Sequence, residues 1–394
     1  SLRLLRQPAK TWVEQSAEVL RWRNKVERKC RWGFLSTADI GRKNWQAIYH
    51  ADNAVVTAVA SRSEDKAQEF IKDCQSFHPF DPAPRAMGSY EELLSSDEVD
   101  AVYVPLPTAL RRPWVVKAAE AGKHVLCEKP CGVSKAEVAE MTRACEANGV
   151  QFMDGVMFMH SQRLPAMKQV LQNEEEFGKL RRIGIQFSFC GPDEFFTDNI
   201  RTHSDLEPAG CLGDLGWYCI RMILWGMDWQ LPHKVTATIL TEAKQPSSPE
   251  AVPVEFSAEL FFEDGVSASF YCSFITENQQ LVRFCGSKGY LELNDFVLPY
   301  LGSELNFDLV KNVFNVHGCD FNMERHATRH SVAEYANSWP SAQETQLIRT
   351  FSETVNSGQM DLQWPRYSVA TQTVLDACFE AARSQASVKP VLPS

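Results

Sequence analysis

The feature that most constrains this chain is a regular alternation of short apolar runs with amphipathic segments between Arg31 and Met153. The apolar runs predict buried strands, and the segments between them, with apolar residues at helical spacing, predict helices. Strands are expected at 32–36, 54–60, 99–104, 124–127 and 151–153, and helices at 40–50, 64–73, 90–94, 113–121 and 134–148. Strands and helices that alternate at this spacing form βαβ units, and hence a doubly wound parallel α/β sheet.

The pattern changes after about residue 180, where apolar and polar residues alternate along several segments. This alternation predicts strands with one buried face, and residues 263–265 and 286–289 have the composition of hairpin turns. The strands are expected at 180–189, 234–241, 254–262, 266–274, 281–286 and 289–293, and a long closing helix at 367–386. The second part of the chain therefore predicts an α+β domain built on an antiparallel sheet.

The composition is that of a globular protein, because 44% of the 394 residues are apolar and 23% are charged. At roughly 150 residues per domain, this length predicts two domains. The net charge of −10 argues against a general nucleic-acid binder, which would present a basic face to the phosphates. No apolar run approaches the roughly 18 to 20 residues that span a bilayer, so a soluble protein without a transmembrane segment is expected.

Twelve cysteines are scattered along the chain, with no Cys-x-x-Cys pair and no Cys/His cluster at zinc spacing. Cys127 and Cys131 are four residues apart, but one such pair is weak evidence for a metal. We therefore expect no metal, and interpret the thiols as small apolar residues of strands and helices. Because so many thiols would mispair in an oxidising environment, an intracellular reducing compartment is expected, the cytoplasm by default.

Residues 1–29 differ from the rest in charge, with eight Lys and Arg against three Glu, a net charge of +5. This basic arm lacks the apolar core of a secretory signal, and its charge leaves a plastid or mitochondrion open as the compartment. Apolar residues between Trp12 and Leu20 predict a helix with one apolar side, which fits docking on a protein partner. A solvated tail is an equally weighted alternative.

The turn after the first predicted strand is where a dinucleotide-binding fold receives the pyrophosphate. Ser36, Ala38 and Gly41 occupy the three positions of the Gly-x-Gly-x-x-Gly motif, so two of its glycines are missing. Small residues at the first two positions still allow close approach, and the hydroxyls of Ser36 and Thr37 can donate to phosphate. On the turn alone, a dinucleotide site and an ordinary strand–helix turn are about equally favoured.

The end of the second predicted strand is more informative about the cofactor. Enzymes that use NAD usually place Asp or Glu there to bind the ribose 2′-hydroxyl. This chain has Ser61, Arg62 and Ser63 instead, and a guanidinium flanked by hydroxyls suits a 2′-phosphate. The sequence therefore favours NADP over NAD, with a solvated surface arginine as the alternative.

Residues 122–130 read GKHVLCEKP, a run that resembles a signature of the Gfo/Idh/MocA family of oxidoreductases. Supporting segments lie at 32–42 (WGFLSTADIGR), 102–108 (VYVPLPT), 153–155 (MDG) and 210–218 (GCLGDLGWY). The resemblance runs from about residue 31 to about residue 386. Within the family, the chain is most similar to the branch of dimeric dihydrodiol dehydrogenase, NADP-dependent D-xylose dehydrogenase and glucose–fructose oxidoreductase.

The resemblance implies an α/β Rossmann domain followed by an α+β domain with a large open-faced antiparallel sheet. We expect a basic extension at 1–30, the dinucleotide-binding domain at 31–155, completed by a helix at 366–386, and a substrate and dimerisation domain at 156–365. It also implies a homodimer formed through the C-terminal sheet. The implied reaction is hydride transfer between a nicotinamide cofactor and a sugar-like small molecule.

Residue by residue, the resemblance implies that Lys129, Asp214 and Tyr218 form the catalytic set. It places the cofactor against Ser36, Thr37, Ala38, Asp39, Ile40, Ser61, Arg62, Ser63, Pro105, Leu106, Thr108, Glu128, Lys129 and Pro130. The chemistry is consistent with these roles, because oxidation of an alcohol needs a base for the hydroxyl proton. Tyrosine, with a reference pKa of about 10, is a weak base, so we expect the Lys129 ammonium to lower the pKa of Tyr218. Asp214, one helical turn before Tyr218, can orient Lys129 or substrate.

Three further residues are candidates for substrate contact. Arg111 stands where relatives usually carry His, and Phe158 stands where they often carry Trp or Tyr. His160 follows, as a pocket-lining or structural residue rather than a base. The expected function is an NADP-dependent oxidoreductase acting on a CH–OH carbon of a sugar, polyol or dihydrodiol. The alternative is a family member kept as a structural or assembly subunit, or as an NADP-binding regulator, with little catalysis.

Overall fold

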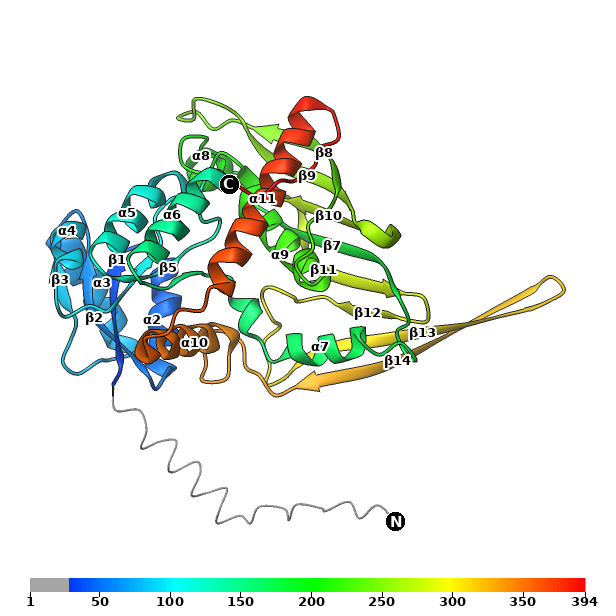
Figure 1. Ribbon diagram of the computed structural model, residues 1–394, viewed down its shortest axis with the longest axis horizontal. Helices are drawn as coiled ribbons and strands as arrows, with labels where there is room; N and C mark the ends of the chain where they lie inside the picture. The colour runs from blue at the N-terminus through cyan, green and yellow to red at the C-terminus, as the bar shows by residue number, and fades with distance from the viewer. Residues whose placement is uncertain (1–27, 394) are drawn as a thin grey trace, which may run out of the picture.

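Two sheets organise the protein, whose computed structural model describes residues 28–393 (Figure 1). The first sheet is parallel, with the strand order β3-β2-β1-β4-β5-β6, and it confirms the predicted α/β domain. Its strands are β1 Cys30–Leu35, β2 Ala54–Ala60, β3 Arg85–Met87, β4 Ala101–Val104, β5 His124–Cys127 and β6 Phe152–Asp154. Residues 1–27, which carry most of the predicted basic arm, lie outside the described residues.

The helices between these strands are α2 Ile40–His50, α3 Glu64–Phe77, α4 Tyr90–Leu94, α5 Thr108–Glu120 and α6 Lys135–Ala147. Ser134 caps α6 as expected, because its hydroxyl accepts from the backbone N–H of Glu137. The expected start of α5 at Pro113 is wrong, since the helix begins at Thr108 and holds Pro113 inside. Glu207 accepts hydrogen bonds from both the amide and the hydroxyl of Thr108, which fixes this earlier start.

The second sheet has eight strands in the order β14-β13-β12-β11-β7-β10-β9-β8. Neighbouring strands are antiparallel except β7 and β10, which are parallel, so the predicted antiparallel sheet is confirmed with one mixed pair. The strands are β7 Leu180–Cys190, β8 Lys234–Ala243, β9 Val252–Phe261, β10 Ser267–Ser273, β11 Ile275–Gly286, β12 Tyr290–Leu293, β13 Leu305–His317 and β14 Asp320–Val332. The hairpin formed by β13 and β14 was not predicted.

The helices after the parallel sheet are α7 Arg163–Leu171, α8 Phe195–Asp198, α9 Trp217–Gly226, α10 Gln343–Ser357 and α11 Gln363–Ser384. Helices α7 and α9 pack on the eight-stranded sheet, whereas α10 packs against α2 and β1 of the parallel sheet. The C-terminal helix α11 contacts α6 and β6 of the parallel-sheet domain, and also α9 and β8 of the part built on the eight-stranded sheet (Figure 1). Asp376 of α11 accepts from the backbone N–H of Lys135, and Thr371 accepts from Arg221 at 2.7 Å. Helix α11 therefore joins the two sheets.

A buried ion pair lies between the two sheets. The carboxylate of Asp154, at the end of β6, binds the guanidinium of Arg221 in α9 through both oxygens, and neither side chain is exposed to solvent. Breaking such a pair costs about 3–5 kcal/mol, because it leaves an uncompensated buried charge. Among residues 28–393, no helix is both long and apolar enough to cross a bilayer.

Candidate active site

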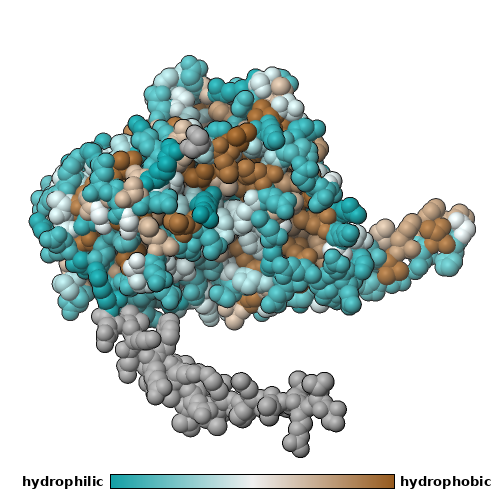
Figure 2. All heavy atoms as spheres, viewed as in Figure 1, coloured by the Kyte–Doolittle hydropathy of each residue, from teal (hydrophilic) through white to brown (hydrophobic). Residues whose placement is uncertain are grey.

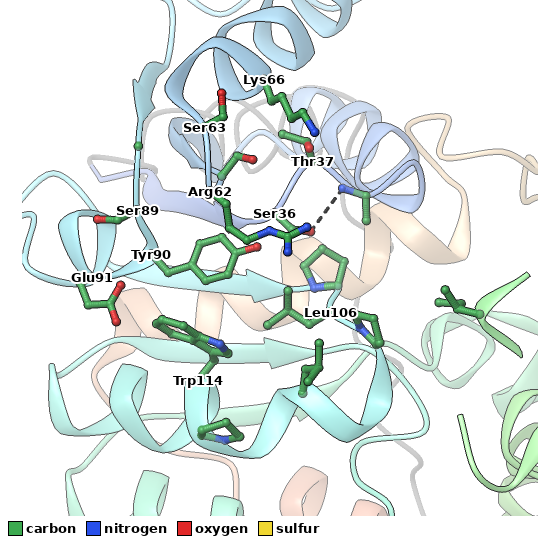
Figure 3. Close-up of a pocket in the computed structure, with 18 residues that line it drawn as sticks. Ser36, Thr37, Arg62, Ser63, Lys66, Ser89, Tyr90, Glu91, Leu106 and Trp114 are labelled. Carbon is green, nitrogen blue, oxygen red and sulfur yellow. Dashed lines mark hydrogen bonds between the residues drawn. The ribbon is translucent and has the colours of Figure 1, made fainter. Parts of the chain in front are cut away.

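A cavity of about 930 Å³ opens at the carboxyl ends of the parallel strands (Figure 3). Residues 36–38 follow β1, residues 61–63 follow β2, and residues 105–107 follow β4. The chain reverses its winding direction between β1 and β4, and open α/β sheets bind ligands at such a point. We call this cavity the cofactor cleft.

The turn after β1 has the backbone conformation that the missing glycines would normally supply. Ser36 has a φ of 130°, a region that side chains rarely adopt and glycine adopts freely. Its hydroxyl accepts a hydrogen bond from the backbone N–H of Ala38 at 3.2 Å, as the dashed line in Figure 3 marks. Ser36, Thr37 and Ala38 line the cleft, whereas Asp39 and Ile40 do not.

Two basic side chains line the cleft beyond β2. Arg62 and Lys66 belong to the cavity wall, and neither is hydrogen-bonded or ion-paired to another described residue (Figure 3). The one acidic residue of the wall, Glu91, is held by Lys117 at 3.0 Å. Lys66 was not among the predicted residues, although its place in the first turn of α3, shortly after Arg62, was a readable signal.

An aromatic pair forms another wall of the cleft and was also missed from the sequence. The rings of Tyr90 and Trp114 meet edge to face, with centroids 4.8 Å apart. They come from α4 and α5, which are distant in sequence, so no local pattern reveals the pair. An aromatic wall beside hydroxyls and two cations that pair with no other described residue fits a nucleotide that carries a phosphate group.

A second cavity, of about 520 Å³, lies against the eight-stranded sheet, and Lys129, Asp214 and Tyr218 all line it. Lys129 follows β5, Asp214 lies in a π-helical turn at Leu212–Gly216, and Tyr218 lies in α9. The ammonium of Lys129 donates to the Asp214 carboxylate at 2.6 Å and to its backbone oxygen at 2.8 Å. It also lies 4.5 Å from the centroid of the Tyr218 ring. The structure thus brings together the three residues of the predicted catalytic set.

Asp214 is held by a second cation that sequence reasoning missed. Arg201 donates from Nε to the other carboxylate oxygen of Asp214 at 2.9 Å. Although burial opposes ionisation, Lys129 and Arg201 together lower the pKa of Asp214 to about 2. Asp214 is therefore a permanent carboxylate at neutral pH that anchors Lys129, and it is not a proton acceptor for the substrate.

The expectation that Lys129 lowers the pKa of Tyr218 is wrong. Burial raises that pKa well above its usual value, and the negative charges of Glu128 and Asp214 add to the effect. Lys129 lies over the ring face with its charge bound to Asp214, and burial and the two carboxylates outweigh its effect on the phenol. Tyr218 is consequently a neutral phenol, and its hydroxyl donates to the sulfur of Met157 at 3.8 Å.

Arg111 lines neither cavity, and its guanidinium binds backbone carbonyls instead. It donates to Leu106 at 2.6 Å, to Glu128 at 2.8 Å, and to Pro130. Glu128 and Pro130 flank Lys129, so Arg111 fixes the turn that carries it and ties that turn to the segment after β4. Thr108, Glu128 and Pro130 likewise belong to this support rather than to either cavity wall.

Phe158 and His160 also lie outside both cavities. Phe158 is buried and packs against the ring of Tyr218, with centroids 6.2 Å apart. His160 is stacked on Trp364 at 4.5 Å, and burial, with the nearby charge of Arg221, lowers its pKa to about 3. His160 is therefore a neutral, buried side chain.

The remaining lining of the second cavity combines apolar and polar side chains. The apolar ones are Phe187, Phe189, Leu215, Val297, Leu298 and Tyr300, and Ser188, Asn278 and Gln280 add polar groups to the catalytic set. A neutral hydroxyl and an ammonium that face such a cavity can bind and polarise the oxygen of an alcohol or carbonyl. Residues 28–393 contain no cluster of three or more His, Cys, Asp or Glu side chains suited to a metal ion.

Comparison with known proteins gives a consistent result across most of the chain. The model GFO_IDH_MocA, described as an oxidoreductase family with an NAD-binding Rossmann fold, matches residues 30–156. The model of the GFO/IDH/MocA C-terminal domain matches residues 165–292.

Individual relatives extend the match to nearly the full length. The D-xylose 1-dehydrogenase (NADP(+)) 2 of Haloferax volcanii is 30% identical over 359 residues, which cover 91% of this chain and 98% of that protein. The trans-1,2-dihydrobenzene-1,2-diol dehydrogenase of Bos taurus is 31% identical, over 67% of this chain and 74% of its own. A 3-ketoreductase from Actinomadura kijaniata, solved with NADP and TDP-benzene, superimposes with a TM-score of 0.72 at 26% identity, covering 90% of this chain and 98% of its own.

Proposed function

The chain belongs to the Gfo/Idh/MocA family of oxidoreductases, and on this basis we propose that it transfers hydride between NADP and a carbon of a sugar, polyol or dihydrodiol. The observation that carries the proposal is the contact of Lys129 with both Asp214 and the ring of Tyr218 at the wall of the second cavity. This set combines a proton donor with a fixed positive charge, as reaction at an alcohol or carbonyl carbon requires.

Arg62 and Lys66 support the choice of NADP, because two unpaired cations in the cofactor cleft suit the 2′-phosphate. Residues 36–38 would receive the pyrophosphate, and Tyr90 and Trp114 would pack against the adenine. When bound, the nicotinamide supplies or accepts the hydride. The relatives named for NADP(+), or solved with NADP, agree with this assignment.

Tyr218 enters the proposed reaction as a neutral phenol. When a carbonyl is reduced, this hydroxyl donates a hydrogen bond to the substrate oxygen and passes its proton to that oxygen, and the phenolate left behind regains a proton from water. Oxidation of an alcohol runs through the same steps in reverse, so Tyr218 first loses its proton to water and then accepts the proton of the alcohol. The ammonium of Lys129, at the wall of this cavity, stabilises the alkoxide that develops on the substrate oxygen. Asp214 keeps Lys129 in place, and Arg201 keeps Asp214 ionised.

Four further assignments rest on the architecture and on the sequence. We propose a dinucleotide-binding domain at 31–155 and a substrate domain at 156–365, with a homodimer formed through the large sheet. The twelve free thiols favour an intracellular reducing compartment. The basic arm at 1–29 stays a candidate for docking on a protein partner, with a plastid or mitochondrial location left open.

The decisive experiment follows nicotinamide absorbance with NADP or NAD against a panel of aldoses, polyols and trans-dihydrodiols, in both directions. We expect turnover with at least one class, faster with NADP, and its loss in a Lys129→Met variant that still binds NADP. An enzyme that binds NADP tightly but turns over no substrate would instead favour a structural or regulatory role.

A further inference from the structure

A long two-stranded ribbon projects from the edge of the eight-stranded sheet (Figure 1). Strands β13 and β14 pair antiparallel along thirteen residues each, from Leu305 opposite Val332 to His317 opposite Asp320. From residue 312 to residue 329 every side chain is exposed, so no other described segment covers either face of the outer ribbon. Because an isolated two-stranded hairpin is at best marginally stable in water, this geometry indicates that another surface supports it.

The outer ribbon carries an apolar patch on one of its faces (Figure 2). Phe314 lies directly opposite Met323, and Val316 lies directly opposite Phe321. Since side chains two apart along a strand share a face, all four lie together. They are between 50% and 69% exposed, and the rings of Phe314 and Phe321 are stacked with centroids 6.2 Å apart. Such a contiguous exposed apolar patch marks an interaction surface.

The strand register shows which side of the large sheet this patch continues. Asp308 precedes Phe314 by six residues on the same face of β13, and it pairs with Glu292 of β12. Glu292 in turn lies opposite Arg283 of β11. These charged residues belong to the face of the sheet that points away from the buried core, which we call the uncovered face. The apolar patch therefore lies on the same face and continues it past the edge of the sheet, along the projecting ribbon.

The charges of the uncovered face are of mixed sign and close together. Arg325 on the ribbon binds Glu292 at 2.6 Å, and Arg329 binds Asp308 at 3.0 Å. Near the middle of the sheet, Arg182 binds Glu259 at 2.5 Å. A surface that carries both signs close together can face a second copy of itself without like charges meeting. Because the chain as a whole has a net charge of −10, not every part of its surface has this property.

We propose that the β13–β14 ribbon is an arm that packs its apolar patch on a second copy of this chain. In a two-fold dimer the same surface of each copy faces the other, so an extension that overhangs its own sheet reaches the partner's body. Each copy would then bury Phe314, Val316, Phe321 and Met323 against its partner. The inference rests on the homodimer proposed above and adds the element that clamps it.

The test compares two double variants of the full chain that differ by one residue position on the same strands. Phe314→Glu/Phe321→Glu places charges in the patch, whereas Asn315→Glu/Asn322→Glu places them on a directly opposed pair of the other ribbon face. Sedimentation of the wild type should give twice the 44.5 kDa chain mass, and the first variant should raise the dimer dissociation constant at least tenfold. The second variant should behave as wild type.

A dimer equally stable in both variants would overturn the arm while leaving the sheet-mediated dimer intact, and a monomeric wild type would overturn both. Turnover assays on the same samples keep these outcomes separate from the catalytic proposal, since the ribbon residues line neither cavity.

If the charged patch variant fails to fold, amide hydrogen exchange of the wild type replaces it. Exchange between Phe314 and Met323 should slow as protein concentration rises through the dimerisation range. Exchange that does not depend on concentration there would overturn the arm.

Discussion

The cofactor cleft and the catalytic cavity are built in opposite ways. The cleft draws most of its wall from residues 36–114, which follow successive parallel strands, and its cations pair with no other described residue. The catalytic cavity joins Lys129 to a residue 85 positions later, and its charges are ion-paired and nearly buried. From this difference we expect substitutions in the cleft to have modest and independent effects on cofactor binding. Substitutions in the catalytic cavity should instead affect turnover as a coupled unit.

The largest expected effect comes from breaking that unit. Tyr218→Phe removes only the phenolic hydroxyl and should lower turnover by about 10²- to 10⁴-fold, the usual cost of losing a positioned acid or base. Lys129→Met should cost at least as much, because it removes the charge that stabilises the alkoxide. Steady-state kinetics measure the losses, and the dissociation constant for NADP should change little in Tyr218→Phe.

The double variant tests the coupling itself. If both residues act on one proton, Tyr218→Phe/Lys129→Met should be little worse than the poorer single variant. If the fold-losses in turnover of the two single variants multiply in the double variant, the two residues have independent roles. The catalytic cavity would then not differ from the cleft in coupling.

Next in size is the loss of the unpaired guanidinium from the cleft. Arg62→Ala should weaken NADP binding by about 10- to 100-fold, since a hydrogen bond to a charged group contributes roughly 1.5–3 kcal/mol. Binding of NAD, which lacks the 2′-phosphate, should hardly change. Calorimetric titration with both cofactors measures this, and the NADP preference should shrink as salt is added. Equal weakening of both cofactors would mean that Arg62 does not bind the 2′-phosphate.

The buried His160, which lies outside both cavities, should make stability depend on pH. His160 has a pKa of about 3 in the folded protein against 6.5 when unfolded, so below pH 6.5 the unfolded chain binds a proton that the folded chain does not. The free energy of unfolding should therefore fall with decreasing pH, by up to about 1.4 kcal/mol per unit. His160→Phe should flatten this slope between pH 6.5 and 5, as urea melts at several pH values can show. An unchanged slope would assign the acid sensitivity elsewhere.

The smallest expected effect is that of Lys66, at the rim of the cleft. Lys66→Ala should weaken NADP binding by about two- to fivefold, because exposed ion pairs contribute up to about 1 kcal/mol. Lys72→Ala, on the same helix but outside the cavity wall, is the matched control and should bind NADP as wild type does. Equal effects of the two variants would reduce Lys66 to a general electrostatic role.

Sequence reasoning was most successful where local pattern alone decides the structure. The bounds of α2, β2, α4 and β5 agree with expectation, since each is a short periodic run ended by turn residues. The outer part of the β13–β14 ribbon was missed because residues 312–329 are exposed on both faces, so burial imposes no alternation there. The inner part of β13 does alternate, at Leu305, Phe307 and Leu309, and this signal was overlooked.

In the candidate site, likewise, the residues set by local sequence pattern were predicted, and those brought in by tertiary packing were not. The residues of the turn after β1 and of the end of β2 could be located from their places in the βαβ pattern. Arg201 and Trp114 could not, because they reach the site only through tertiary packing. The pKa of Tyr218 was predicted in the wrong direction, since the sequence reveals neither its burial nor the binding of Lys129 to Asp214.

Helix α11 has a consequence for biosynthesis. The parallel sheet has all its strands once Asp154 has been made, yet α11, which packs on β6 and α6, ends only at Ser384. At 5–20 residues per second, translation of the intervening segment takes roughly 10 to 50 s. During that interval the surface awaiting α11 is open on the ribosome, so the nascent chain should depend on chaperones until its last helix emerges.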